Sequence, residues 1–314
     1  MLENTSHTTS FLLTGYEETG DLQYLYFLLI LLVYMLTIAA NTGIICVICV
    51  ESSLHEPMYM FLCSLQVNGL YGSTALCPAL LVNILSDSHE ISYTACLIQI
   101  YCLTTYGMCE FLTLAVMGYD RYVSICYPFY YSTIMRPTRV YKLIALTWLL
   151  AFAEFTVMII ISAQLKLCRR AIEKVYCDNY SVVRLACDDI TINNIIGSIV
   201  NIAFTVCPLL LILYSYLQIL RVCLKSSSAS RSKALNTCVP HLVTVINFFV
   251  ASLFELFQSR FNMQHIPLII RVLLSVQFLI LPPLLNPIIY GFRNKKLTEK
   301  IKKVLSKKLT FPNL

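Results

Sequence analysis

The sequence contains few charged residues, few glycines and a single tryptophan. Of its 314 residues, 13% are charged and nine are glycine, whereas a soluble globular protein carries about 25% charged residues. So little glycine leaves little material for loops that cradle phosphate groups. The chain also has neither a zinc-ligand spacing nor a Ser/His/Asp set in a plausible context. We therefore expect neither an enzyme nor a bound cofactor.

Long hydrophobic runs take the place of the missing charge. Hydrophobic residues make up 58% of the chain, and its mean hydropathy is +0.71. A helix needs about 20 mostly apolar residues to cross a bilayer. Seven stretches are long enough: Tyr24 to Val50, Pro57 to Ile84, Thr94 to Ile125, Leu143 to Ala163, Thr191 to Leu224, Thr237 to Phe257 and Ile266 to Gly291.

These stretches predict an all-α membrane protein, a seven-transmembrane helix bundle. A transporter or channel is the rival by hydropathy alone, because it too is a bundle of helices. Transporters usually show internal repeats with broken spans, and the sequence has no such repeat. We expect one domain over residues 1–314, with an extracellular segment 1–22, the bundle 23–291, and a cytoplasmic helix and tail 292–314.

The charges that flank the runs predict the orientation of the bundle. Cytoplasmic loops carry an excess of Lys and Arg, and with the carboxyl terminus inside, the inner side holds Arg136, Arg139, Lys142, Arg221, Lys225, Arg231, Lys233 and the basic residues of 293–308. The outer side holds Glu3, Glu17, Glu18, Asp21, Asp87 and Glu90. The net charge of +6 is then explained by anionic lipid of the bilayer. No basic stripe with interleaved aromatics suggests nucleic acid.

The predicted outer segments carry the signs of exposure to the secretory pathway. Residues 1–21 are polar and lack a basic segment followed by a short apolar core, so we expect the first span to act as the targeting signal. Glycosylation sequons begin at Asn4 and Asn179. Four of the 14 cysteines also fall on this oxidising side, which implies two disulfides with three alternative pairings: Cys96, Cys168, Cys177 and Cys187.

Four sequence motifs identify a family. MGYDRYVSIC ends the third span at 117–126, LHEPMYMFL opens the second at 54–62, KALNTCVPHL opens the sixth at 233–242, and PPLLNPIIYGFRNKK closes the seventh at 282–296. The chain resembles olfactory receptors, which are rhodopsin-like G-protein-coupled receptors, over essentially its whole length. Within that family, VNGLYGSTAL and YCDNYSVVRL are most similar to receptors of aquatic vertebrates. A non-olfactory receptor of the same fold is the remaining alternative.

The resemblance implies a switch for G-protein coupling at the inner end of the bundle. In such receptors the arginine of the third span leaves its neighbouring aspartate and meets tyrosines of the fifth and seventh spans when the sixth span swings outward. Pro287 would free a carbonyl, and Asn286 would stabilise the resulting bend. His241 is either a titrating switch, since its unperturbed pKa is near neutrality, or a neutral packed side chain. The residues concerned are Asp120, Arg121, Tyr122, Tyr216, His241, Asn286, Pro287 and Tyr290.

The resemblance also implies a ligand site between the outer halves of spans three, five and six. The matched positions are Leu103, Thr104, Gly107, Met108, Tyr180, Val200, Asn201, Ser252, Leu256 and Arg260. Arg260 would meet carboxylate-bearing odorants, or would face water or Glu255. Glu154 either lines the cavity or pairs across helices. An amine ligand is disfavoured, because Leu103 stands where an aspartate would be wanted.

Further roles follow from the same resemblance. It implies that Cys96 pairs with Cys177, and Cys168 with Cys187. Glu110 would hold a sodium ion with Asn68 or Asn41, or would instead be protonated and hydrogen-bonded. Asn41 would lock helices together through a hydrogen bond. No cysteine follows Cys238, so the tail lacks an acylation site.

The implied activity is odorant-dependent signalling across a membrane. A small ligand shifts the population toward the active arrangement if its contacts there are better than in the resting one. The partner would be the olfactory stimulatory G protein, which raises cyclic AMP, at the plasma membrane of sensory neuron cilia. Behind the seventh span, four apolar residues at helical spacing predict an amphipathic helix on the inner membrane surface: Leu297, Ile301, Val304 and Leu305.

Overall fold

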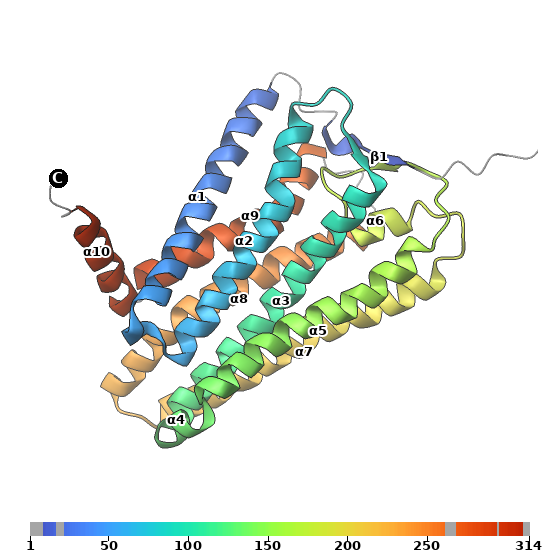
Figure 1. Cartoon of the computed structure of the whole chain (residues 1–314). Helices are drawn as coiled ribbons and strands as arrows, with labels where there is room; N and C mark the ends of the chain where they lie inside the picture. The colour runs from blue at the N-terminus through green and yellow to red at the C-terminus, as the bar shows by residue number, and fades with distance from the viewer. Residues whose placement is uncertain (1–8, 17–21, 261–267, 294, 310–314) are drawn as a thin grey trace, which may run out of the picture.

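Seven long helices form the body of the protein (Figure 1). The computed structural model describes residues 9–16, 22–260, 268–293 and 295–309, without the side chains of 230, 233, 257–260, 268, 269, 271–275, 292, 293, 295 and 304–309. The long helices are α1 (Gln23–Val50), α2 (Pro57–Ile84), α3 (Tyr93–Cys126), α5 (Pro137–Ala163), α7 (Thr191–Leu224), α8 (Ser228–Arg260) and α9 (Leu268–Arg293). Among the described residues, six helices are long and apolar enough to cross a membrane, and α9 has a shorter apolar stretch, Val276–Gly291.

The predicted seven-helix bundle is confirmed, and two helices begin more than one turn earlier than expected. Both α2 and α7 have the predicted bounds, whereas α5 begins at Pro137 rather than Leu143. Helix α8 begins at Ser228 rather than Thr237. Hydropathy finds only the part of a helix that faces lipid, so polar first turns escape it. Pro137 is well suited to a first turn, because its missing N–H would have no partner there.

Shorter elements connect the bundle helices. They are the strands β1 (Ser10–Leu13), β2 (Glu90–Ser92) and β3 (Ala171–Ile172), the single-turn helices η1 (Thr14–Tyr16), η3 (Ser52–Leu54) and η4 (Pro128–Tyr130), and the helices α4 (Tyr131–Ile134), α6 (Asn179–Val183) and α10 (Lys295–Leu309). The predicted amphipathic helix corresponds to α10. Its Leu297 is fully buried, and its lysines pair with the α1–α2 connection, Lys296 with Glu56 at 2.6 Å and Lys300 with Glu51 at 2.8 Å.

The expectation of an all-α protein missed a small sheet at one end of the bundle. The strand order is β2-β1-β3, and β1 runs antiparallel to β2 and parallel to β3. Phe11 and Leu13 of β1 are buried, and the hydroxyl of Tyr16 donates to the carbonyl of Val175 at 2.8 Å. The segment before α1 is thereby fastened to two later connections. We call this end the sheet end, and the opposite end, where α4 lies, the α4 end (Figure 1).

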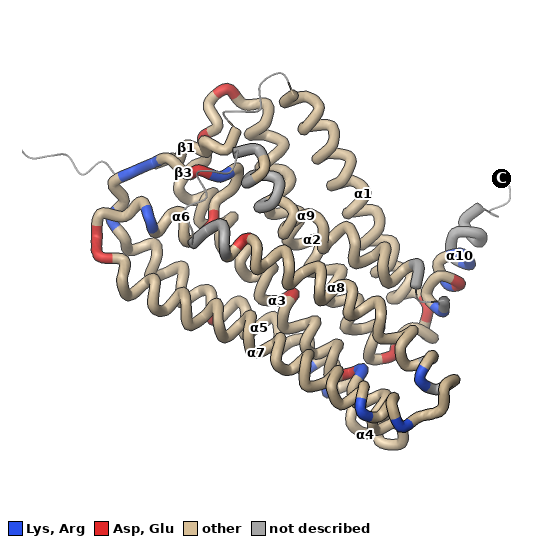
Figure 2. The backbone as a smooth tube through the Cα atoms, turned by 180° about the vertical axis from the view of Figure 1, so that it is seen from behind, with Lys and Arg blue, Asp and Glu red and all other residues tan. Residues whose placement is uncertain are grey.

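Charged residues gather at both ends of the bundle and are sparse between them (Figure 2). The prediction that basic residues lie on one side is only partly right, because the connection between α5 and α7 adds basic residues to the sheet end: Lys166, Arg169, Arg170, Lys174 and Arg184. The charges of long connections have little influence on the orientation of a protein in the membrane. The shorter connections do place basic residues at the α4 end, since Arg136 lies between α4 and α5 and Arg139 lies in the first turn of α5.

Helix α3 runs through the centre and packs against α2, α5 and α7. Polar side chains tie the other helices together. The indole of Trp148 in α5 donates to the hydroxyl of Ser64 in α2 at 3.0 Å. Asn41 in α1 donates to the carbonyl of Pro283 in α9 at 2.8 Å. That carbonyl lies four residues before Pro287, which has no N–H to offer it. Asn41 therefore has the predicted helix-locking role, and the prediction that Asn286 stabilises this bend is wrong, because Asn286 donates to Glu110 instead.

A close contact between α2 and α3 depends on glycine. A Cβ atom added at Gly72 would lie 2.5 Å from the ring of Tyr106, which is fully buried. The ring cannot retreat easily, because it packs against Phe248 of α8 and Phe278 of α9. By contrast, a Cβ at Gly43 of α1 has no neighbour within 4 Å among the described residues.

We predict that Gly72→Ala destabilises the protein, because overpacking a filled core costs about 1–3 kcal/mol. Gly43→Ala is the matched control, since alanine is favoured over glycine in a helix by about 1 kcal/mol and meets open space there. Thermal unfolding of the purified variants measures both effects. A Gly72→Ala variant as stable as Gly43→Ala would show that the α2–α3 contact is not close-packed.

Candidate functional site

A cavity of about 240 Å³ opens at the sheet end between α3, α7 and α8. Nine of the ten residues predicted to bind ligand line it: Leu103, Thr104, Gly107, Met108, Tyr180, Val200, Asn201, Ser252 and Leu256. The tenth, Arg260, has a side chain outside the described residues. The structure thus brings together positions separated by almost half of the chain. Pockets of this kind, mostly apolar with a few polar groups, are typical of small-molecule sites.

Residues that the sequence analysis missed give the cavity its character. Aromatic rings of three helices line it, those of Phe111, Phe204 and Phe278, and so do two acidic side chains, Asp178 and Glu255. The acidic pair had a signal in the sequence. Asp178 follows a bridging cysteine directly, and Glu255 precedes the predicted Leu256.

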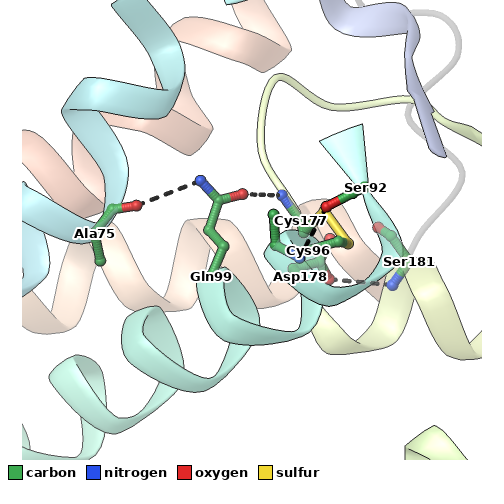
Figure 3. The surroundings of a disulfide bond; sticks show 8 residues. Ala75, Ser92, Cys96, Gln99, Cys177, Asp178 and Ser181 are labelled. Atoms are coloured by element: carbon green, nitrogen blue, oxygen red, sulfur yellow. Dashed lines mark hydrogen bonds between the residues drawn. A yellow bond between two sulfur atoms is a disulfide. The ribbon is translucent and has the colours of Figure 1, made fainter. Parts of the chain in front are cut away.

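Two disulfides hold the connection between α5 and α7 over the cavity. The structure pairs Cys96 with Cys177 and Cys168 with Cys187, which is the pairing that the resemblance implied. Beside the first disulfide, Gln99 of α3 accepts a hydrogen bond from the backbone N–H of Cys177 at 2.8 Å and donates to the carbonyl of Ala75 at 3.4 Å (Figure 3). We call residues 164–190 the lid. The lid is therefore attached to α3 by a covalent bond and a buried amide.

A buried lysine joins the lid to α8. Lys174 pairs with Glu255 of α8 at 2.5 Å and with Asp178 of the lid at 3.2 Å, and the hydroxyl of Tyr176 donates to Glu255 at 2.9 Å. Burial alone would lower the pKa of Lys174, but Asp178, Tyr176 and Glu255 together raise it well above its usual value.

The raised pKa sets the pH range over which this pairing stabilises the fold. A group whose pKa is higher in the folded state adds its full stability at any pH below its unfolded pKa, which is about 10.4 for lysine. This stability is lost only as the pH rises from that value through the folded pKa. The pairing is therefore fully present at neutral pH.

Two predicted residues lie in unexpected places. Asn179 lines the cavity, and its Oδ1 atom is buried. Glycosylation at this sequon stays a prediction, and Asn4 lies outside the described residues. Glu154 is half-buried in α5 and is not among the described residues that line the cavity, which disfavours the first of its two alternatives.

A polar cluster occupies the middle of the bundle. Glu110 of α3 is fully buried, and its two carboxylate oxygens accept hydrogen bonds from the amides of Asn68 in α2 and Asn286 in α9, each at 2.8 Å. Of the residues predicted to hold sodium, the structure joins Glu110 to Asn68, while Asn41 bonds backbone carbonyls of α1 and α9. Asn286 was missed as a partner of Glu110.

The buried cluster retains oxygen atoms that no described residue satisfies. The amide oxygens of Asn41, Asn68 and Asn286 are buried and lack a hydrogen-bond donor among the described residues. Oxygen donors of this kind suit a hard cation. The described part of the chain has no cluster of three or more His, Cys, Asp or Glu side chains that could hold a metal ion. The set therefore fits a sodium ion through one carboxylate and neutral amide oxygens.

At the α4 end, Arg121 is held by its neighbour. Its guanidinium donates to Asp120 at 2.6 Å, and the other carboxylate oxygen of Asp120 accepts from the hydroxyl of Tyr131 at 2.8 Å. Asp120 is fully buried. Tyr122, which follows Arg121 directly, donates its hydroxyl to that of Tyr127 at 3.3 Å.

A second polar contact, near Arg121, joins α7, α8 and α3. His241 of α8 lies between the hydroxyl of Tyr216, 2.8 Å from Nδ1, and the carbonyl of Leu114, 2.9 Å from Nε2. A carbonyl can only accept, so Nε2 donates, and Nδ1 of a neutral ring then accepts from Tyr216. His241 is also buried, and burial disfavours a charged ring, so the neutral packed alternative is favoured here. Tyr290 of α9, another residue of the predicted switch, is also buried.

Comparisons with known proteins show what the chain is similar to. Residues 30–308 match the olfactory receptor family. The chain is 34% identical to human olfactory receptor 6N1, over 97% of each chain, and 36% identical to human olfactory receptor 2K2, over 97% of this chain and 96% of that one. It is also 34% identical to mouse olfactory receptor 1E16, over 99% of each.

We predict that Glu110→Ala destabilises the fold, because it leaves the amides of Asn68 and Asn286 without an acceptor. A buried donor without a partner costs about 1–3 kcal/mol, so the free energy of unfolding should fall by about 2 kcal/mol or more. The midpoint of thermal unfolding in detergent measures this change. Glu154→Ala is the matched control, because Glu154 has no hydrogen bond to the described residues. Equal midpoints for the two variants would contradict the assignment of Glu110 as the central acceptor.

Proposed function

The chain belongs to the olfactory receptor family, and we propose that its odorant binds in the cavity beneath the lid. The protein is an odorant-activated G-protein-coupled receptor of the membrane and is not an enzyme. Membership in the family decides against the three alternatives that the sequence analysis left open, which were a transporter, a channel and a non-olfactory receptor. The observation that supports the binding site best is that the cavity is lined by nine of the ten residues proposed for it.

We place the sheet end outside the cell and the α4 end in the cytoplasm. Two disulfides at the sheet end suit an oxidising environment, and the short connections at the α4 end carry the basic residues that favour the cytoplasm. The lid and the cavity then face the outer solution, from which an odorant arrives. Localisation to the plasma membrane of olfactory cilia follows from the same proposal.

The contacts at the α4 end are those of a resting state in this proposal. Arg121 is bound to Asp120, and Tyr216 is bound to His241 of α8. An outward swing of α8 would draw His241 away from Leu114 and free Tyr216 to meet Arg121 together with Tyr290. An odorant drives this change only to the extent that it binds the swung arrangement more tightly.

The proposed G-protein surface is the α4 end around the end of α3. The short segment after α3 exposes aromatic side chains, with Phe129 94% and Tyr130 64% exposed. Large exposed aromatics at the end of a bundle are suited to bind a protein partner. We propose the olfactory stimulatory G protein as that partner, and a rise in cyclic AMP as the result.

The polar cluster at Glu110 is proposed to set the resting state. Sodium held by Glu110, Asn68 and the neighbouring amide oxygens would favour the arrangement in which α2, α3 and α9 meet. The alternative is a protonated Glu110 without a metal ion. Comparing thermal unfolding in sodium chloride with that in choline chloride distinguishes the two, because only a bound sodium ion stabilises the folded state by mass action.

Arg121→Ala is expected to abolish odorant-evoked cyclic AMP while the protein still reaches the cell surface. The guanidinium is the group that would meet Tyr216 in the active state, so its loss removes that contact. Arg221→Ala is the matched control, because Arg221 is exposed in the last turn of α7. A reporter assay with surface staining measures both variants. Full signalling by Arg121→Ala would refute the proposed switch.

Ser252→Phe is expected to reduce the response to every activating odorant by at least about tenfold, because a phenyl ring would fill part of the cavity. Val206→Phe is the matched control, since Val206 is 41% exposed on α7 and does not line the cavity. Dose–response curves of the cyclic AMP reporter, normalised to surface expression, measure the change. Unaltered potency in Ser252→Phe would place the odorant elsewhere.

A further inference from the structure

The charged side chains of the cavity wall bear on the class of ligand. Two charged side chains among the described residues line the cavity, Asp178 of the lid and Glu255 of α8, and both are acidic. Lys174 pairs with both, but it does not line the cavity, and its side chain is only 8% exposed. One lysine balances only one of the two carboxylates. Among the described side chains, which do not include that of Arg260, the wall therefore keeps a surplus of one negative charge.

The same wall presents hydrogen-bond acceptors without donors. Glu255 accepts from Lys174 and Tyr176 through Oε1, while Oε2 is buried and has no donor among the described residues. Asp178 accepts from the backbone of Ser181 through Oδ2, and its buried Oδ1 has only the lysine nearby, without a hydrogen bond. Oδ1 of Asn179, the next residue, is also buried without a donor in the described part of the chain. Unpaired buried acceptors are rare in folded proteins, so a ligand that donates hydrogen bonds is expected here.

We propose that this cavity, taken as the odorant site, binds amines, with the ammonium group between Glu255 and Asp178. An ammonium group supplies both the missing positive charge and the missing donors. The apolar body of the ligand lies against the rings of Phe111, Phe204 and Phe278. The inference rests on the proposed odorant cavity and names the chemical class that fits it.

The position of Lys174 explains why an acid is the poorer ligand. The ammonium group of Lys174 is turned to Glu255 and Asp178 and is screened from the cavity by them. A carboxylate in the cavity would therefore meet like charges first, which is unfavourable at short range. The sequence analysis disfavoured an amine ligand, because Leu103 of α3 stands where an aspartate would be wanted to bind it. In the folded protein, the acids come from the lid and from α8 instead.

The test compares ligands that differ only in the head group. The probes are hexylamine, hexanol and hexanoic acid, together with phenylethylamine, phenylethanol and phenylacetic acid. Binding is measured as thermal stabilisation of the purified full-length receptor, and signalling as cyclic AMP in cells. We expect the amines to stabilise the receptor and to activate it more potently than the alcohols and acids of the same skeleton.

Two variants remove the surplus charge without removing the hydrogen-bonding shape. Glu255→Gln and Asp178→Asn should each weaken amine binding and potency by at least about tenfold, the effect expected for one hydrogen bond to a charged group. Alcohol responses should change much less. Asparagine also retains the helix-capping acceptor at position 178, so Asp178→Asn covers the case in which Glu255→Gln does not fold. Glu154→Gln, which removes a carboxylate outside the cavity, is the matched control and should leave amine potency unchanged.

Each result decides the question. The proposal is overturned if acids or alcohols are the only class that binds, if no amine stabilises the purified receptor, or if amine affinity is equal in the parent, Glu255→Gln and Asp178→Asn. Amine binding without any cyclic AMP response would leave this inference standing and would count against the proposed signalling function. Cyclic AMP responses confined to acids would support the proposed signalling function and would overturn the inference that the ligand is an amine.

Discussion

A carboxylate buried within a membrane-spanning bundle must be met by donors from the protein itself, and the centre of this receptor is arranged around that requirement. Glu110 of α3 receives one amide from α2 and one from α9. No water or lipid headgroup at that depth replaces such donors. The three helices are therefore fixed in register at one level, and the cavity lies on the sheet side of it while Arg121 lies on the other.

Charged side chains follow the same rule at the two ends of the bundle. Lys174 is enclosed by two carboxylates where α8 reaches the sheet end, and Arg121 is held by Asp120 near the α4 end of α3. Helix α8 takes part at both levels, through Glu255 at the sheet end and through His241 at the other. A helix held by discrete polar contacts, rather than by uniform packing, has a small number of alternative positions. This is the property that the proposed outward swing of α8 requires.

Hydropathy predicted the helices well because lipid imposes a minimum apolar length on each span. It did not predict the polar first turns of α5 and α8, since these lie beyond the apolar stretch. The strand Ser10–Leu13 was missed for a related reason. Its partners, Glu90–Ser92 and Ala171–Ile172, are distant in sequence and too short to form strands alone. In the cavity, motif positions predicted the apolar wall, whereas no motif assigned a ligand role to Asp178 or Glu255.

The sequence by itself determined the number of spans, the family and the positions of the motif residues, because all of these are local patterns of residue type. The tertiary structure decided which polar groups meet. Asn286 donates to Glu110 while Asn41 takes the carbonyl of Pro283, and Lys174 draws the lid to α8. Such pairings join residues far apart in the chain. Each amide or carboxylate has several potential partners in the sequence, and only the packing of the helices brings one of them within hydrogen-bonding distance.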